Sequence, residues 1–371
     1  VDTATVNIAN VSDGAETDTP TDGQLRVTLS NASSTDTTVT YSVTGSATAD
    51  SDFTALLGSV TISANSTQAL IDVSVLTDDI VEDDESVIVT LTGFTARDPQ
   101  VTLGTTTAAT VNITDDDAAS ITIGDMSVTE GGDLTFTVST DKQIDTNVLV
   151  DVAFVDVSTE GVADFANSGQ QITLNANTSS QSVTVSTVND TVVEGTETLT
   201  ATISLPSQAL GNRGVTGADS GTGTILDNDT AQLFYSLATS SVNEAVAGGI
   251  HNVGVTLLLT SNGVASSGTL DSDVTVQVDD LFGGVGTGDA TRDTDYTSAS
   301  DPQTLTFTSA SVNGTATQNY TLTIANDGDQ ESNETINLAL INASALATID
   351  LARDDHTVTI IDDDTPSISV A

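Results

Sequence analysis

The sequence contains no cysteine and no tryptophan, and only six of its 371 residues are basic. The absence of cysteine excludes disulfides, thiolate metal sites and cysteine nucleophiles. The single lysine, Lys142, and five scattered arginines form no basic patch, while 53 acidic residues leave a formal net charge of −47. Such a surface repels nucleic acid and anionic lipid, so neither is an expected partner.

Aromatic residues and long apolar runs are also scarce. Aromatics make up 3% of the chain, whereas hydrophobic residues reach 37%, so β-branched and aliphatic side chains must build the cores. No window reaches the roughly 18 apolar residues of a membrane-spanning helix, so we expect no membrane span in this segment. Val1 opens the sequence without a charged or apolar leader, which indicates a segment of a longer chain. The length predicts two to four domains.

The chain contains few side chains of the types that usually act in catalysis. An enzyme needs an activated group in a cleft, and the chain offers two histidines, His251 and His356, which we expect to be structural or exposed. Acid pairs are frequent enough to occur by chance, and no aromatic run could stack against a sugar. We therefore predict that the chain is not an enzyme.

One acidic pattern occurs three times with fixed internal spacing. It first appears in TDDIVEDDESVIVTLTGF, which starts at Thr77, and returns in VNDTVVEGTETLTATIS and ANDGDQESNETINLALIN. In each copy an aspartate is followed four residues later by a glutamate and three residues after that by another. The sets are Asp78, Glu82 and Glu85; Asp190, Glu194 and Glu197; and Asp327, Glu331 and Glu334. Such recurrence indicates repeated structural units.

Further acidic landmarks keep the same order around each copy. A glutamate opens each unit, an aspartate precedes the pattern, and an acidic triplet, or two aspartates around an asparagine, closes the unit. The boundaries therefore fall near residues 117 and 229. This predicts units at 1–117, 118–229 and 230–364, with 365–371 as the start of a further unit or a tail.

Apolar residues recur at every second position after each acidic pattern. They are Val87, Val89 and Leu91; Leu199, Ala201 and Ile203; and Ile336, Leu338 and Leu340. A period of two is typical of β-strands, and SVTISA, LTFTVST and QSVTVST show similar alternation. Several short strands per unit, separated by Gly, Asn, Asp and Ser clusters, predict an all-β fold of three tandem antiparallel β-sandwiches.

These features together resemble the Calx-beta domain family. The resemblance is carried by VTEGG, by the Asp-Phe and Asp-Tyr dipeptides, by the Asp-x3-Glu-x2-Glu segment and by the closing acids, and it covers essentially the whole chain. Calx-beta domains are known from the regulatory loop of sodium/calcium exchangers and from large extracellular proteins, including bacterial adhesins. The resemblance implies a seven-stranded immunoglobulin-like sandwich whose acidic loops gather at one end and bind calcium.

The residues themselves also favour a cation site. Ca²⁺ takes six to eight oxygen ligands from carboxylates, carbonyls and water. Successive loops of a sandwich alternate between its two ends, so acidic segments an even number of strands apart share an end. Bound divalent charge would then relieve the repulsion among them.

The candidate calcium ligands are the recurring acids of each unit. In the first unit they are Glu16, Asp52, Asp78, Asp79, Glu82, Glu85, Asp115, Asp116 and Asp117. In the second they are Glu130, Asp164, Asp190, Glu194, Glu197, Asp227 and Asp229. In the third they are Glu244, Asp295, Asp327, Asp329, Glu331, Glu334, Asp362, Asp363 and Asp364. Thr191 and Asn228 replace two of these acids in the second unit, where we expect fewer or weaker ions.

The alternative for the acids is a solvated surface of the kind that adapts proteins to high salt. That adaptation would spread acids along the polar strand faces. Here those faces are mostly Thr and Ser, and the acids concentrate at loop positions in register. The pattern therefore favours calcium, although a salt-tolerant source would favour both.

Short linkers indicate how the units act together. Three residues separate Asp117 from the next strand at Ile121, and three separate Asp229 from Leu233, so each acidic end abuts the following unit. We predict a calcium-rigidified, elongated rod: an extender segment of a large secreted or cell-surface protein, a bacterial adhesin, whose other domains take a cell-surface or glycan ligand. Like charge argues for a monomer unless exposed edge strands pair.

A ligand-binding adhesion module is the alternative function. The third unit carries an insertion, SSGTLDSDVTVQVDDLFGGVGTGDATRD, whose glycines do not match a phosphate-binding loop. Its simplest interpretation is a long strand pair with a flexible Gly-rich loop, and a sugar or peptide would be held around Phe282. A calcium sensor is less favoured, because an extracellular site stays near saturation.

Overall fold

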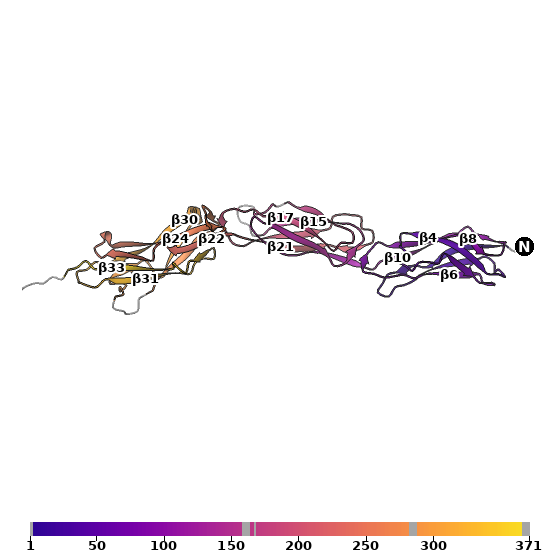
Figure 1. Cartoon of the computed structure of the whole chain (residues 1–371), viewed down its shortest axis with the longest axis horizontal. Coiled ribbons are helices and arrows are strands. Elements are labelled where there is room, and N and C mark those ends of the chain that lie inside the picture. The colour runs from indigo at the N-terminus through magenta and orange to yellow at the C-terminus, as the bar shows by residue number, and fades with distance from the viewer. Residues whose placement is uncertain (1–2, 158–163, 167, 282–287, 366–371) are drawn as a thin grey trace, which may run out of the picture.

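The computed structural model describes residues 3–157, 164–166, 168–281 and 288–365, and most of these residues lie in β-strands. Their helical segments are two single turns, η1 (Ala247–Gly249) and η2 (Ser309–Ser311). The strands form three pairs of packed sheets that lie one after another along the longest axis of the molecule (Figure 1). The predicted all-β fold of three tandem sandwiches is confirmed. No helix in the described residues is long and apolar enough to cross a membrane.

The first sandwich pairs a four-stranded sheet with a five-stranded sheet. The first sheet has the order β6 (Gln68–Val73), β3 (Gly23–Leu29), β1 (Ala4–Ser12) and β9 (Val101–Leu103). The second has the order β2 (Gly14–Ala15), β10 (Ala108–Thr114), β8 (Glu85–Ala96), β4 (Thr37–Gly45) and β5 (Ser59–Ile62). The edge pairs β1–β9 and β2–β10 are parallel, whereas the other ladders of this sandwich are antiparallel.

The second and third sandwiches repeat this topology. The four-stranded sheet of the second sandwich has the order β17 (Ser180–Ser186), β13 (Asp133–Thr140), β11 (Ala118–Ile123) and β20 (Gly214–Thr216). Its five-stranded sheet has the order β12 (Met126–Thr129), β21 (Ala218–Leu226), β19 (Glu197–Ser204), β15 (Val148–Asp156) and β16 (Gln170–Leu174). The first sheet of the third sandwich has the order β28 (Tyr296–Ser298), β30 (Thr315–Ile324), β24 (Ile250–Ser261), β22 (Asp229–Tyr235) and β32 (Ala347–Ile349), and β25 (Val264–Ala265) also pairs with β24. Its second sheet has the order β23 (Thr239–Asn243), β33 (Asp355–Ile361), β31 (Glu334–Ile341), β27 (Val274–Asp280) and β29 (Gln303–Phe307).

The period-two pattern places aliphatic side chains between the two sheets of each sandwich. All nine residues predicted to alternate in β8, β19 and β31 are buried, which confirms that part of the analysis. Each sandwich has its own hydrophobic cluster. Burying apolar area contributes about 25 cal/mol per Å², so three separate cores let three domains fold without disulfides.

Two short parallel strand pairs join neighbouring sandwiches. β7 (Ile80–Val81) pairs with β14 (Gln143–Ile144), and β18 (Val192–Val193) pairs with β26 (Thr269–Leu270). Val81 is completely buried in the core of the second sandwich, and Val193 is buried in the core of the third. The first two acidic patterns therefore each contain the apolar residue that docks the next domain. We call the β7–β14 contact joint one and the β18–β26 contact joint two.

The segment expected to be an insertion in the third unit is only partly one. β27 occupies the same sheet position as β15 of the second sandwich and pairs with β29 and β31. The predicted long strand pair within the segment is therefore wrong, because VTVQVDD is a regular strand of the fold. Phe282 and most of the Gly-rich loop lie outside the described residues, as do residues 366–371 of the predicted tail.

The close approach of the backbones at joint two predicts a sensitive position. A Cβ at Gly268 would collide with the Thr191 carbonyl oxygen, whereas a Cβ at Gly195 meets nothing within 4 Å. The substitution Gly268→Ala should separate β26 from β18, because backbone cannot yield as a flexible side chain can. Hydrogen exchange should then speed up at the Thr269 and Asp271 N–H groups, which donate to Thr191 and Val193.

Gly195→Ala is the matched control in the same joint, and it should leave both exchange rates near those of the parent chain. Equal protection of the two N–H groups in Gly268→Ala would contradict the docking described here.

Candidate metal centres

The acidic end of each sandwich is assembled from strand termini. In the first sandwich Glu16 follows β2, Glu85 begins β8 and Asp115 follows β10. β2 runs parallel to β10 and β8 runs antiparallel to it, so these three termini meet at one end of the sheet. The Glu16 N–H donates to the Thr114 carbonyl oxygen at 2.9 Å, which fixes the opening loop beside the closing one.

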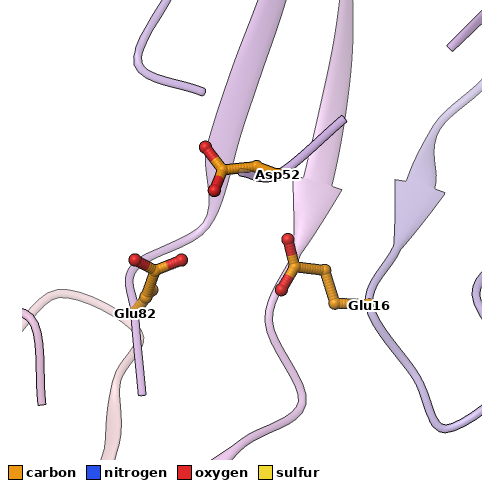
Figure 2. Close-up of side chains that lie close together, drawn as sticks. All are labelled: Glu16, Asp52 and Glu82. Atoms are coloured by element: carbon orange, nitrogen blue, oxygen red, sulfur yellow. The ribbon is translucent and has the colours of Figure 1, made fainter. Parts of the chain in front are cut away.

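Glu16, Asp52 and Glu82 point toward a common space in the first sandwich (Figure 2). One carboxylate oxygen from each lies within 4.8 Å of the others. Burial raises the pKa of Glu16 to about 8, and the charges of Glu82 and Asp52 add to the rise. Burial also raises the pKa of Glu82 to about 7, with Asp52 and Asp78 contributing. The folded chain therefore resists full ionisation of this group.

The first aspartate of each closing segment links two loops through hydrogen bonds. The Asp115 carboxylate accepts the Glu82 N–H at 2.7 Å and the Asp117 N–H at 2.9 Å. Asp227 accepts the two equivalent N–H groups at 2.7 and 2.6 Å, and Asp362 accepts them at 3.0 Å each. The fold thus holds the acidic pattern against the closing segment in the same way three times.

The second sandwich brings all seven of its predicted acids into overlapping groups. Within each group, one ligand atom per residue lies within 4.8 Å of the others. The groups are Glu130, Asp227 and Asp229; Glu130, Asp190 and Glu194; and Asp164, Glu194 and Glu197. Burial raises the pKa of Glu130 and of Glu194, each to about 7, and neighbouring aspartates add to both shifts.

The third sandwich has the most open acidic end. Glu244, Asp362 and Asp364 form a group like those above, and burial raises the pKa of Glu244 to about 7. Asp327 and Glu331 are exposed, whereas Glu82 and Glu194, the residues equivalent to Glu331, are half-buried. In the first two sandwiches a following domain contacts this loop.

A carboxyl pair lies beside each cluster. Asp52 with Glu85, Asp164 with Glu197, and Asp295 with Glu334 are joined by side-chain hydrogen bonds. Burial raises the pKa of the glutamate in every pair, and the hydrogen bond to the aspartate adds to the rise. A carboxyl–carboxylate bond needs one proton, so the glutamate carries that proton when no cation is bound.

The donor set fits a hard divalent cation. Glu85 Oε2, Glu130 Oε1 and Asp364 Oδ2 are buried and have no hydrogen-bond donor within the described residues. Leaving a buried carboxylate oxygen without a partner costs free energy. Oxygen ligands that converge from several loops are those that Ca²⁺ prefers. A bound cation would give these atoms the partner that they lack.

Four of the predicted ligands make ion pairs or are exposed to solvent. Asp79 and Asp117 both accept from the Lys142 ammonium of the second sandwich, at 3.5 and 2.5 Å. Asp116 and Asp363 are exposed. The acidic groups named in the paragraphs above do not include Asp79, Asp116, Asp117 or Asp363.

Sequence reasoning missed one further acid at each joint. Asp145 adds to the rise in the pKa of Glu82, and Asp271 does the same for Glu194. The Asp145 N–H donates to the Val81 carbonyl oxygen, and the Asp271 N–H donates to that of Val193. In the sequence these two acids end the similar tripeptides QID and TLD. The similarity could not identify them as part of the acidic clusters, because they reach the clusters only when two domains dock.

Comparison with known proteins agrees with this architecture. The sequence profile described as "Calx-beta domain" matches residues 6–117, 120–229 and 261–364. No curated protein sequence matches the chain significantly.

Among solved structures, the chain is similar to the calcium binding domain CBD12 of CALX1.1, with 17% identity over 59% of this chain and 99% of that one, at a TM-score of 0.28. It is also similar to the apo-form Calx CBD1 domain, with 19% identity over 36% and 99% of the two chains and a TM-score of 0.27. For an Escherichia coli alpha-2-macroglobulin the identity is 11%, over 97% of this chain and 33% of that one, with a TM-score of 0.23.

The raised carboxyl pKa values predict an unusual pH dependence. The pKa of Glu16, Glu130 and Glu244 rises from 4.5 to between about 7 and 8 on folding, so the folded chain holds protons that the unfolded chain releases. Stability is greatest below the unfolded pKa and is lost as pH rises through the folded pKa. In chelator, the melting temperature should fall between about pH 5 and pH 8. Saturating calcium should remove that fall.

Glu16→Gln should reduce the fall in the first sandwich, and the exposed neighbour Asp18 provides the control Asp18→Asn. Burial lowers the pKa of His251 and His356 in the third sandwich. The stability that the two neutral histidines contribute therefore has the opposite pH dependence, and it is lost as pH falls below about 6.5. A melting temperature in chelator that rises steadily from pH 5 to pH 8 in the first sandwich would contradict the assigned shifts.

Proposed function

Because the chain belongs to the Calx-beta domain family, we propose that it is a calcium-binding extender whose joints are rigidified by the ion. One observation carries this proposal: the acidic clusters of the first two sandwiches lie at the joints. Val81 and Val193 sit between acids of the pattern in sequence and are buried in the next domain. An ion that orders the acidic loop therefore also orders the contact with the following sandwich.

The second sandwich illustrates the proposed ligand set. Glu130 and Glu194 each belong to two of the acidic groups, so each would bridge neighbouring ions. Asp190 and Asp227 would complete the shell from the pattern loop and the closing segment. Calcium would neutralise the acidic groups, a role that protons on the glutamates fill when no cation is bound. Glu16, Asp52 and Glu82 in the first sandwich and Glu244, Asp362 and Asp364 in the third would act in the same way.

Joint one also carries its own ion pairs. Lys142 contacts Asp117 and Asp79, and Arg213 makes a two-pronged contact with Asp145 at 2.5 and 2.6 Å. Arg213 also lies 3.5 Å from Asp83. The strand register aligns Lys142 with Gly268 and Arg213 with Ala345 at joint two, which therefore lacks these two cations.

The setting that fits such a rod is outside the cell. Extracellular calcium modules bind with Kd of about 10⁻⁴ to 10⁻³ M, which requires millimolar calcium. A chain without cysteine cannot use disulfides there, so bound ions take over as cross-links between loops. We assign the segment to a large secreted or cell-surface protein, a bacterial adhesin, in which it acts as a monomeric, non-enzymatic spacer and other domains hold the cell-surface or glycan ligand.

Small-angle X-ray scattering and thermal melting test the proposal together. With calcium at a hundredfold excess over Kd, each site adds about 2.7 kcal/mol to the free energy of unfolding. Calcium should therefore raise the melting temperature and give a longer, stiffer scattering profile than excess chelator does. Magnesium is the ion control, since it demands a smaller octahedral shell.

Glu130→Gln should weaken calcium stabilisation of the second sandwich, and the exposed Asp133→Asn should leave it unchanged. If calcium changes neither the melting temperature nor the scattering profile, the acids are a solvated surface and the proposal fails.

The ion pairs predict that the two joints respond differently to salt. Because the chain has no cysteine, dye pairs can be placed on exposed strand positions through Thr61→Cys, Thr184→Cys and Thr306→Cys, two at a time. In chelator at low salt, single-molecule energy transfer should show a narrower distribution across joint one than across joint two. Lys142→Met, or about 1 M salt, should broaden joint one, because exposed charges are screened within about 3 Å at that salt.

Arg26→Met, distant from both joints in sequence, serves as the charge control. Equal widths at both joints in every condition would show that the ion pairs do not contribute to docking.

A further inference from the structure

The two histidines of the chain meet on one serine in the third sandwich. His251 belongs to β24 in one sheet, whereas Ser240 and His356 belong to β23 and β33 in the other. The Ser240 Oγ atom lies 2.9 Å from His251 Nε2 and 2.8 Å from His356 Nε2. Both ring nitrogens are thus directed at a single point between the sheets.

The hydrogen bonds fix the orientation of the His356 ring. His356 Nδ1 lies 2.6 Å from the Leu237 carbonyl oxygen, and since a carbonyl accepts, Nδ1 carries the proton. The Nε2 lone pair therefore faces Ser240. A histidine held by a carbonyl at one nitrogen, with a free lone pair at the other, has the arrangement that is usual for metal-binding imidazoles.

We propose that His251 and His356 bind a divalent transition-metal ion, of the Zn²⁺, Ni²⁺ or Cu²⁺ class, through their Nε2 atoms at the place of the Ser240 hydroxyl. Imidazole nitrogen suits these ions and is not a calcium ligand of the kind found at the acidic ends. Zn–N bonds are about 2.0–2.1 Å long, so each ring needs to move by about 0.8 Å. Rotation about one bond withdraws the Ser240 hydroxyl, and water completes the shell.

The surroundings permit an ion to enter and stay. His356 is 4% exposed, but His251 and Ser240 are half-buried, which gives the site one open side. The centroid of the Tyr235 ring lies 5.2 Å from that of the His356 ring, and the Tyr235 ring covers one side of the His356 ring. Burial lowers the pKa of both histidines, so the rings are neutral at pH 7 as metal binding requires. His251 binds after its ring proton moves to Nδ1.

The test uses Cu²⁺ as the probe on the tag-free full chain, with excess calcium to saturate the acidic ends. Electron paramagnetic resonance should show about one Cu²⁺ per chain with nitrogen coupling, and Zn²⁺ should displace it. His251→Gln and His356→Gln should each weaken Cu²⁺ binding and remove the two-nitrogen coupling, and the double variant should lose the imidazole signal. Because the chain holds only these two histidines, the double variant also gives the background from the terminal amine.

Ser240→Ala separates a metal site from a purely structural hydrogen-bond cluster. It removes the hydroxyl and leaves both nitrogens directed at the same point, so Cu²⁺ binding should persist or tighten. If His356→Gln does not fold, judged by circular dichroism, the half-buried His251→Gln carries the test. The proposal is overturned if the parent chain shows no nitrogen coupling, or if the double variant shows the same coupling as the parent.

Discussion

Repulsion among carboxylates at the end of each sandwich is the constraint on which the structure depends. Seven acids recur in every unit, and the fold brings most of them within a few ångströms of one another. Two ways of relieving that repulsion are visible within the chain. Glutamates such as Glu16 and Glu85 hold protons at raised pKa, and Lys142 supplies a positive charge at joint one. A divalent cation would replace the protons and act on all three ends alike.

The same residues link this electrostatic problem to the shape of the molecule. The loop between Asp78 and Glu85 contains β7, and the loop between Asp190 and Glu197 contains β18. Each of these loops carries acids toward its own sandwich and an aliphatic side chain into the next. A shift of the acidic loop must therefore move the docking strand. The end-to-end arrangement in Figure 1 follows from this double use of one segment.

Much of this could be predicted from sequence, for physical reasons that also explain the failures. Strand alternation around Val87 and the recurrence of acids are local or periodic signals, and the chain repeats them three times. Burial of Val81 in a neighbouring core, and the approach of Lys142 to Asp79, depend on the docking of two domains. The segment VTVQVDD was misinterpreted because the longer spacing of the third unit suggested an insertion there. Most of the extra residues instead precede that strand: Val274 lies 30 residues after Glu244, whereas the equivalent Val148 lies 18 residues after Glu130.

Comparison of the two joints shows which charges are compensated within the chain. Joint one has three acids that joint two lacks: Asp79, Asp83 and Asp84 correspond to Thr191, Gly195 and Thr196. Its extra bases, Lys142 and Arg213, are likewise replaced by Gly268 and Ala345 at joint two.

Extra acids and extra bases are therefore present together or absent together, as expected for ion pairs that serve docking. The seven recurring acids behave differently, because the second sandwich keeps all of them with neither of these bases. A set of acids that persists when the nearby bases are lost needs compensation from another source, either protons held by glutamates such as Glu130 and Glu194 or a bound cation. A divalent cation from solution meets that requirement at both joints.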